Sequence, residues 1–168
     1  MSPYWVAWTG HRDLADPLMA GLLIEAECER LTREHPRPIC ITGGALGTDT
    51  LVAEYCLAAG LQYTIYLPFP PSVHTQHWSE PNRRHLQTLM EGAVYVGWLG
   101  AEYDVALYLR RDEWMVRDAD LVIALWSGRR SGGTYHTLSY ARRCGVPVRT
   151  LRVEEKHVID LRRGRAIL

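Results

Sequence analysis

The chain has 168 residues, which is the usual size of one domain of ~100–200 residues. With 47% hydrophobic and 23% charged residues, it is too apolar for a disordered chain and too often interrupted by charge for a membrane span. Nineteen Lys and Arg balance nineteen Asp and Glu, so the chain as a whole has no electrostatic attraction to anionic lipid or nucleic acid, and only a local basic patch would bind DNA.

Strand-like and helix-like segments alternate in the first third of the chain. Residues 4–8 form an aromatic and β-branched run that predicts a first strand, and Pro17 opens a segment with apolar residues near helical spacing. Residues 39–41 predict a second strand, and residues 50–59 predict a helix that Gly60 ends. This repeated unit is typical of an α/β protein with a mainly parallel sheet.

The same alternation continues to residue 153. The predicted elements are strands at residues 61–67, 93–98, 121–126 and 147–153, and helices at about residues 81–90, 105–115 and 135–144. The strand at 121–126 is almost uninterrupted in its apolar character, which indicates burial on both faces. Prolines make residues 68–78 a rigid excursion that we expect to act as a lid.

Three loops that follow strands carry the residues of greatest chemical interest. Thr9-Gly10-His11-Arg12 follows the first strand, the segment from Gly43 to Asp49 follows the second, and the segment from Ser127 to Thr134 follows the fifth. In a parallel sheet these loops meet at one rim, where α/β proteins bind ligands. Glycine lets the backbone approach a phosphate, and the N-terminus of the following helix attracts the anion. The spacing fits neither the lysine-bearing P-loop nor GxGxxG, which disfavours standard ATPases and dehydrogenases.

These motifs resemble the SLOG superfamily, which includes the SMF/DprA and LOG proteins, and in particular its YpsA-like branch. The matching segments are TGHR at residues 9–12, GGALGTD at 43–49, PF with Gln76 and Trp78, and RDEWMV at 111–116, followed by DLVIA at 120–124, GGT at 132–134 and YA at 140–141. The matches run in order through nearly the whole chain. Asp112 departs from the family's asparagine at this position, which weakens the transfer of ligand identity.

The resemblance implies a Rossmann-like three-layer domain over residues 1–153, with residues 154–168 as a charged tail compatible with an edge hairpin of the same domain. It also implies that the chain binds a nucleotide or nucleotide-derived ligand as a sensor or carrier. Gly10 and Arg12 would line the phosphate side, and Asp49 would accept from a sugar hydroxyl. The full set of candidate ligand-binding residues is Thr9, Gly10, His11, Arg12, Gly43, Gly44, Gly47, Thr48, Asp49, Arg111, Ser127, Gly128, Arg129, Gly132, Gly133 and Thr134.

Two alternatives stay open. A LOG-like hydrolase would cleave the N-glycosidic bond of a nucleoside monophosphate and needs a carboxylate beside the sugar, with Asp49, Glu54 and Glu113 as candidates and Glu102 as a further one. A DprA-like protein would bind single-stranded DNA through a basic groove and stacking aromatics, which the zero net charge disfavours. Whether the chain is an enzyme is therefore left open.

The remaining expectations concern cysteines, cofactors and assembly. Cys28, Cys40, Cys56 and Cys144 form no CxxC pair and no Cys/His spacing, so we expect buried reduced thiols, no metal and no required cofactor. The N-terminus has no export signal, which predicts a cytoplasmic protein. The family resemblance suggests a homo-oligomer, a dimer or larger.

Overall fold

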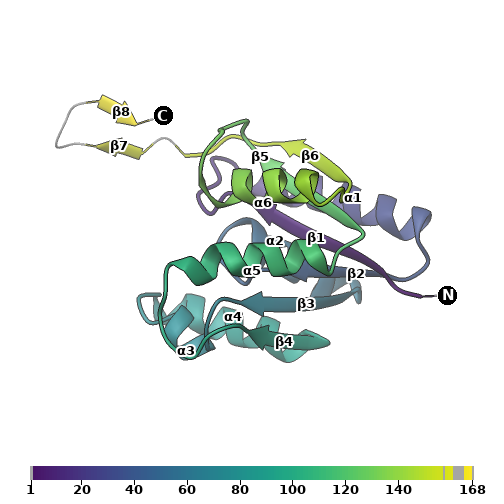
Figure 1. Ribbon diagram of the computed structural model, residues 1–168, viewed down its shortest axis with the longest axis horizontal. Coiled ribbons are helices and arrows are strands. Elements are labelled where there is room, and N and C mark those ends of the chain that lie inside the picture. Colours follow the sequence, from purple (N-terminus) through teal and green to yellow (C-terminus); the bar gives the residue numbers. More distant parts are fainter. Residues whose placement is uncertain (1, 157, 161–164, 168) are drawn as a thin grey trace.

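The computed structural model describes residues 2–156, 158–160 and 165–167. Six parallel strands form its central sheet, in the order β4-β3-β2-β1-β5-β6 (Figure 1). Their bounds are β1 Tyr4–Gly10, β2 Pro38–Thr42, β3 Gln62–Leu67, β4 Tyr95–Trp98, β5 Leu121–Trp126 and β6 Val148–Arg152. The predicted α/β class with a parallel sheet is confirmed, and in the described residues every pair of strands in this sheet is parallel.

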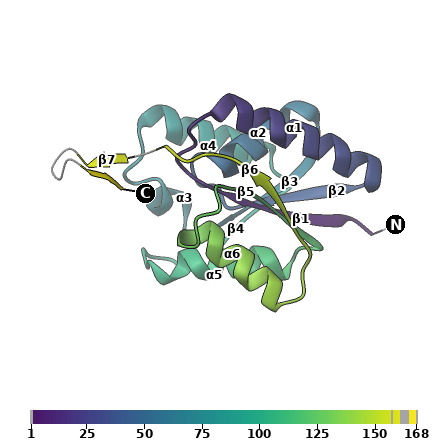
Figure 2. The same ribbon diagram turned by 90° about the horizontal axis from the view of Figure 1, so that it is seen from above.

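Helices cover both faces of this sheet and make three layers. Figure 2 shows α1 (Pro17–Glu34), α2 (Thr48–Ala59) and α4 (Glu80–Gly92) on one face, and α5 (Ala106–Arg117) and α6 (Gly132–Arg143) on the other. A short helix, α3 (Pro71–His74), follows β3. Two apolar clusters fill the space between the layers, one containing Val6, Trp8 and Ile123 and the other containing Ala7 and Val122, because neighbouring residues of a strand point to opposite faces.

The strand order creates a crossover point beside β1. The chain adds β2, β3 and β4 on one side of β1 and then returns to place β5 and β6 on the other side. The loops after β1 and β5 therefore lead to helices on opposite faces of the sheet, which opens a crevice at the carboxyl ends of these two strands. β1 and β5 pair from Val6 with Leu121 to Gly10 with Leu125, so both strands end at this rim.

Some boundaries differ from the sequence prediction. β1 continues to Gly10 because Thr9 and Gly10 still pair with β5. α6 begins at Gly132 instead of residue 135, since a glycine pair that is typical of a turn also fits the first turn of a helix. Cys144 is exposed, so the expectation that all four thiols are buried is wrong for this residue, which lies at the end of α6.

The end of the chain includes a second, smaller sheet. β7 (Val158–Asp160) and β8 (Arg165–Ile167) pair antiparallel as a two-stranded sheet separate from the six-stranded one. Residues 157, 161–164 and 168 of the predicted tail lie outside the described residues. The preceding residues contact the domain directly: Glu154 O accepts from Ala15 N at 2.9 Å, and Lys156 N donates to Asp13 O at 3.1 Å.

Two glycines test whether close backbone approach positions the loops at the rim. Gly47 has a φ of +81°, and an added Cβ would lie 2.3 Å from Arg12 O. Gly60 has a φ of +69°, but an added Cβ would meet nothing within 4 Å. We expect Gly60→Ala to lower the free energy of unfolding by about 1 kcal/mol, from backbone strain alone.

Gly47→Ala causes the same kind of backbone strain and, in addition, a clash with the loop after β1. We therefore expect it to lower the free energy of unfolding by roughly 3 kcal/mol or more. Urea denaturation of both variants measures the difference. Equal losses would show that the approach of Arg12 to Gly47 contributes nothing.

Candidate functional site

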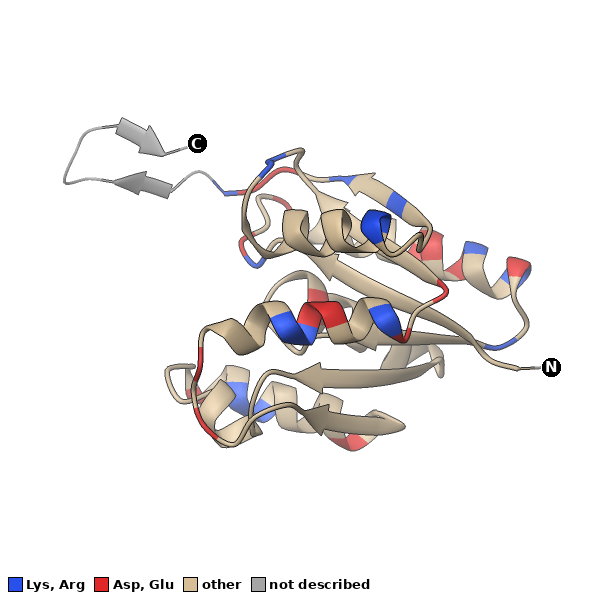
Figure 3. Cartoon of the chain, in the orientation of Figure 1, with Lys and Arg blue, Asp and Glu red and all other residues tan. Residues whose placement is uncertain are grey.

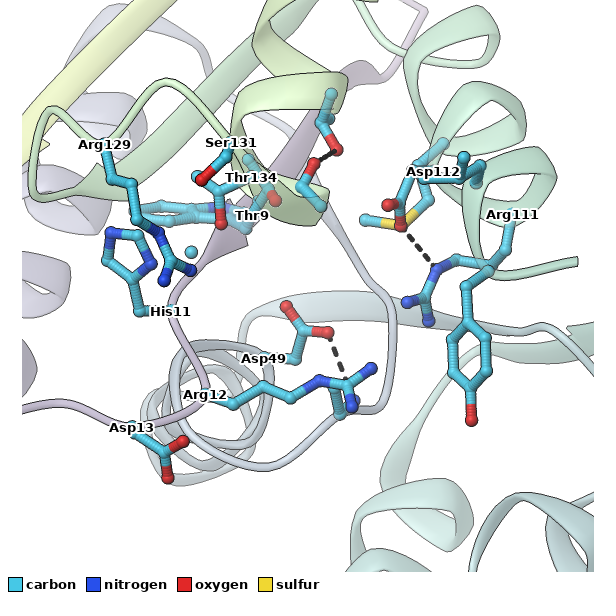
Figure 4. Close-up of a pocket in the computed structure, with 18 of the residues that line it drawn as sticks. Thr9, His11, Arg12, Asp13, Asp49, Arg111, Asp112, Arg129, Ser131 and Thr134 are labelled. Carbon is cyan, nitrogen blue, oxygen red and sulfur yellow. Dashed lines mark hydrogen bonds and ion pairs between the residues drawn. The ribbon is translucent and has the colours of Figure 1, made fainter. Parts of the chain in front are cut away.

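A cavity of about 720 Å³ lies at the carboxyl ends of β1 and β5 (Figure 4). Nine of the predicted ligand-binding residues line it. They come from the end of β1 and the loop after it, the loop after β5, the first turns of α2 and α6, and α5: Thr9, Gly10, His11, Arg12, Asp49, Arg111, Arg129, Gly133 and Thr134. The predicted convergence of these loops is therefore present in the structure. The size is within the range of ~300–1,000 Å³ that is usual for small-molecule sites.

The other predicted residues lie outside the cavity lining: Gly43, Gly44, Gly47, Thr48, Ser127, Gly128 and Gly132. Several of the glycines instead allow protein atoms to approach one another. A Cβ on Gly43 would lie 2.4 Å from Arg111 Nη1, and a Cβ on Gly44 would lie 2.5 Å from Leu67 Cδ2. Thr48 Oγ1 donates to His11 O at 3.0 Å, which fixes the β1 loop to α2.

Arg111 is a buried cation that positions the wall of the cavity. Its Nη1 donates to Gly43 O and, at 3.2 Å, to Tyr66 O, and its Nε donates to Asp112 Oδ1 at 2.8 Å. Asp112, the residue that departs from the family pattern, is thus the ion-pair partner of Arg111. With two of its nitrogens held by protein oxygens, Arg111 acts mainly by tying α5 to the ends of β2 and β3.

Glu155 joins the loops after β1 and β5 to the end of the domain. Its carboxylate lies 3.0 Å from His11 Nδ1, 3.1 Å from Arg129 Nη2 and 3.0 Å from Ser127 Oγ. Ser127 N donates to His11 Nε2 at 2.9 Å, so Nε2 carries no proton and the Nδ1 proton faces Glu155. Burial, together with Arg129, lowers the pKa of His11 against the opposing effect of Glu155, which favours the neutral ring.

Arg12 and Asp49 are two charged groups of the cavity lining that form no ion pair with any described residue. Arg12 is exposed, forms no ion pair with any described residue, and holds its guanidinium carbon 5.4 Å from the centre of the Tyr108 ring. Asp49 Oδ2 accepts from Ala45 N at 3.1 Å, and the residue is only 8% exposed. Burial raises the pKa of Asp49 to about 6, although Arg111 acts in the opposite direction. Figure 4 shows Arg12 and Asp49 between the His11 side and the Arg111 side of the cavity.

The first turn of α6 adds an anion-attracting end to the cavity. Ser131, the residue before the helix, makes no side-chain capping hydrogen bond, and Ser131, Gly133 and Thr134 line the cavity. The N–H groups of a first helical turn have no partners within the helix, and the helix dipole is positive there. The first turn of α2 has fewer free N–H groups for an anion, because Thr48 N already donates to His11 O.

An aromatic and apolar lip, which we define as Tyr103, Val105, Tyr108 and Leu109, forms the remaining side. Tyr103, Val105 and Leu109 are 57%, 69% and 43% exposed. The buried ring of Phe69 lies beneath this lip, with its centre 5.4 Å from that of Tyr103 and 5.3 Å from that of Tyr108. No sequence motif marks these residues or Glu155: Tyr103 and Val105 lie on the loop before α5, Tyr108 and Leu109 lie in its first turn, and Glu155 lies after β6.

Two predicted catalytic carboxylates and the predicted lid lie away from the cavity lining. Glu54 Oε1 lies 2.5 Å from His85 Nε2, and Glu113 Oε1 lies 3.2 Å from His136 Nε2. Asp49 is the one of the three catalytic candidates that lines the cavity, and Glu102 does not. No residue from 68 to 78 lines it either, and His74 Nε2 lies 2.9 Å from Gly44 O, so the excursion supports the glycine loop from behind.

The described part of the chain contains one group of three potential metal ligands, Cys28, Cys40 and Cys56, which lies away from the cavity. None of the helices in that part has the length and apolar character needed to cross a bilayer.

Comparison with known proteins identifies the fold. No protein-family model matches the sequence, and no curated protein matches it. Among solved structures, DprA from Streptococcus pneumoniae matches with a TM-score of 0.69 and 19% identity, over 88% of this chain and 50% of that one. The chain therefore spans about half the length of that protein.

Two further structures extend the likeness. DprA from Helicobacter pylori, described with its single-stranded DNA binding mode, matches with a TM-score of 0.66 and 17% identity, over 92% of this chain and 69% of that one. The molybdenum cofactor binding protein of Rippkaea orientalis matches with a TM-score of 0.56 and 19% identity, over 92% of this chain and 79% of that one. The predicted three-layer, Rossmann-like fold is confirmed by this likeness to the DprA structures, while the YpsA-like branch stays a prediction.

The raised pKa of Asp49 predicts a pH dependence of stability. Because the folded state holds this proton more tightly than the unfolded state, the free energy of unfolding falls as pH rises from 3.8 to about 6. Asp49→Asn removes this titration. We expect the difference in unfolding free energy between wild type and variant to change by up to roughly 3 kcal/mol across this window.

Urea denaturation of both proteins at several pH values measures this difference. If the unfolding free energies of both proteins changed with pH in parallel, the raised pKa of Asp49 would be contradicted, because the other titrating groups are common to both proteins.

Proposed function

We propose that this chain binds a nucleotide or nucleotide-derived small molecule in the cavity at the ends of β1 and β5, as a sensor or carrier. The observation that carries the proposal is the chemistry of the cavity wall. One side offers groups for an anion, a second offers carboxylates for hydroxyl groups, and a third offers aromatic rings. A nucleotide has these three parts in one molecule.

The anion would lie between the first turn of α6 and Arg12. The N–H groups of Gly133 and Thr134 belong to an uncapped first turn, and Arg12 has no competing ion pair among the described residues. A guanidinium and a helix N-terminus are both common phosphate-binding groups. Arg129 would contribute less to anion binding, because its charge is already paired with that of Glu155.

The sugar would lie against Asp49, and the base would lie on the aromatic lip. Ionised carboxylates accept hydrogen bonds from hydroxyl groups, and Asp49 is held in place by Ala45 N. Tyr103 is exposed and lines the cavity, so its ring would be accessible to a base for stacking. The molybdenum cofactor binding protein of similar fold supports a small ligand of this kind.

Hydrolysis of an N-glycosidic bond is the second candidate, and Asp49 is the observation that favours it. A buried carboxyl whose pKa is raised to about 6 suits an acid–base role at neutral pH. Of the three carboxylates predicted as catalytic, only Asp49 could serve, because Glu54 and Glu113 lie away from the cavity lining.

Single-stranded DNA is a weaker candidate, although DprA from Helicobacter pylori binds it. Figure 3 shows Lys and Arg interspersed with Asp and Glu over the helices. Arg111 is buried, so the Arg110-Arg111 pair offers a single exposed cation. A DNA-binding groove needs a continuous positive surface.

Adenosine monophosphate is a suitable first probe for the anion side. We expect Arg12→Gln to weaken its binding roughly 10- to 100-fold, because a charge-assisted hydrogen bond is lost. Arg142→Gln, which removes an exposed arginine at the far end of α6, should leave affinity unchanged. Isothermal titration calorimetry gives the affinities, and mass spectrometry of each mixture detects released adenine.

The outcomes separate the candidate functions. Binding without adenine release supports a sensor or carrier, and adenine release that Asp49→Asn abolishes supports the hydrolase. Binding of an oligonucleotide that weakens steeply with salt, without binding of the monophosphate, would replace both by DNA binding. Unchanged affinity in Arg12→Gln would remove Arg12 from the site.

The aromatic lip gives an independent prediction. Tyr103→Ala should weaken adenosine monophosphate binding about tenfold, since base stacking contributes on the order of 1–3 kcal/mol. It should leave binding of ribose 5-phosphate unchanged, because that probe has no base. Tyr95→Ala is the matched control, since Tyr95 is also half exposed but lies on β4, away from the cavity. Equal effects on both probes would show that Tyr103 only shapes the cavity.

A further inference from the structure

Three cysteines that are distant in the sequence meet inside the domain. Cys28 lies on α1, Cys40 on β2 and Cys56 on α2, and their sulfur atoms all lie within 4.8 Å of one another. Each residue is at most 1% exposed. Their spacing of 12 and 16 residues matches no metal-binding motif, so the sequence alone does not show this thiol cluster.

The surroundings of the thiol cluster are apolar. The three residues belong to the same core cluster as Val6, Ile24 and Val52, between the sheet and the α1–α2 layer. Glu27, next to Cys28, is the nearby carboxylate, and it is paired with Arg149. A charged complex formed here would have no cation of its own to balance it, and burial of an unbalanced charge is strongly unfavourable.

One buried polar group lies beside the thiol cluster without a partner. The indole N–H of Trp8 is buried and forms no hydrogen bond with any described residue. The neighbouring Cys28 and Cys56 thiols lower the pKa of the Cys40 thiol, and this N–H acts in the same direction. A sulfur bound to a metal or metalloid has lost its S–H proton and keeps lone pairs that can accept a hydrogen bond from such an N–H group.

We propose that Cys28, Cys40 and Cys56 form a binding site for a trivalent thiophilic metalloid, with arsenic(III) as the probe. Arsenous acid, As(OH)₃, would lose its three As–O bonds and form three As–S bonds. The three thiol protons leave with the hydroxyl groups as three water molecules. No electron is transferred, and the product is neutral.

The neutral charge of this product distinguishes it from complexes of other thiophilic ions. Copper(I) bound to three thiolates would leave two negative charges in the core, and zinc would leave one. Zinc also prefers four ligands, and no fourth His, Cys, Asp or Glu joins the group in the described part of the chain. Three thiolates around a trivalent centre satisfy both coordination and charge without further protein groups.

This inference does not depend on the proposed function of the cavity. The two sites share only Trp8, which lines the cavity and also belongs to the core cluster that contains the thiols. Either site can fail its test while the other passes, because the probes differ.

Native mass spectrometry of the full chain with arsenous acid, in buffer without added thiols, tests the proposal. We expect one adduct whose mass equals one arsenic atom minus three hydrogen atoms. Because the thiols are buried, arsenous acid is added both to the folded protein and during refolding from urea. Cys144→Ala, which removes the exposed cysteine, should keep the adduct. Cys28→Ala, Cys40→Ala and Cys56→Ala should each lose it.

X-ray absorption spectroscopy on wild-type protein keeps the test decisive if a core variant fails to fold. Three sulfur neighbours of arsenic are expected, and two or fewer would overturn the proposal. Loss of the adduct in Cys144→Ala, or its absence from wild type under both conditions, would also overturn it. Stoichiometric binding of zinc or copper(I) that excludes arsenic would overturn the choice of a trivalent ligand. The adduct should also raise the melting temperature, since it binds the folded state.

Discussion

The buried guanidinium of Arg111 is the contact on which the geometry of the rim depends. It comes from α5 on one face of the sheet and donates to carbonyl oxygens at the ends of β2 and β3. Gly43 has no Cβ, and a Cβ there would occupy the place of this guanidinium. Asp112 pairs with the same group and faces the cavity. These polar contacts therefore fix α5 to the ends of β2 and β3, and the fixed residues Arg111 and Asp112 form one side of the cavity.

Much of this arrangement could be predicted from the sequence. Strand and helix periodicity predicted the six strands of the sheet. Because parallel strands end at one rim, the sequence also predicted that Thr9, Arg12, Asp49 and Thr134 lie close together. The roles of the glycines could not be predicted, because phosphate contact and close protein packing require the same lack of a side chain. For Gly43, Gly44 and Gly47 the structure shows protein packing.

Other features depended on contacts between segments that no local pattern encodes. Glu155 reaches the cavity because residues 154–156 pair with the loop after β1, which is a contact across more than a hundred residues. The aromatic lip forms because Phe69 packs beneath Tyr103 and Tyr108. The thiols of Cys28, Cys40 and Cys56 meet because α1 and α2 pack against each other on the face of the sheet that contains the Cys40 side chain, and the sequence spacing does not show this.

The pairing of charges decides what kind of ligand the cavity suits. Of its three arginines, Arg111 is matched by Asp112 and Arg129 by Glu155, which leaves Arg12 and the first turn of α6 for an anion. Asp49, with Asp13 at the rim, opposes any large accumulation of negative charge. A ligand with one phosphate therefore matches the free charges better than a triphosphate, whose extra charges would face carboxylates without a compensating cation. Because burial raises the pKa of Asp49 to about 6, its part of this repulsion would be reduced at acidic pH and nearly complete at neutral pH, so under the proposed function the preference between ligands would change with pH through this buried carboxyl.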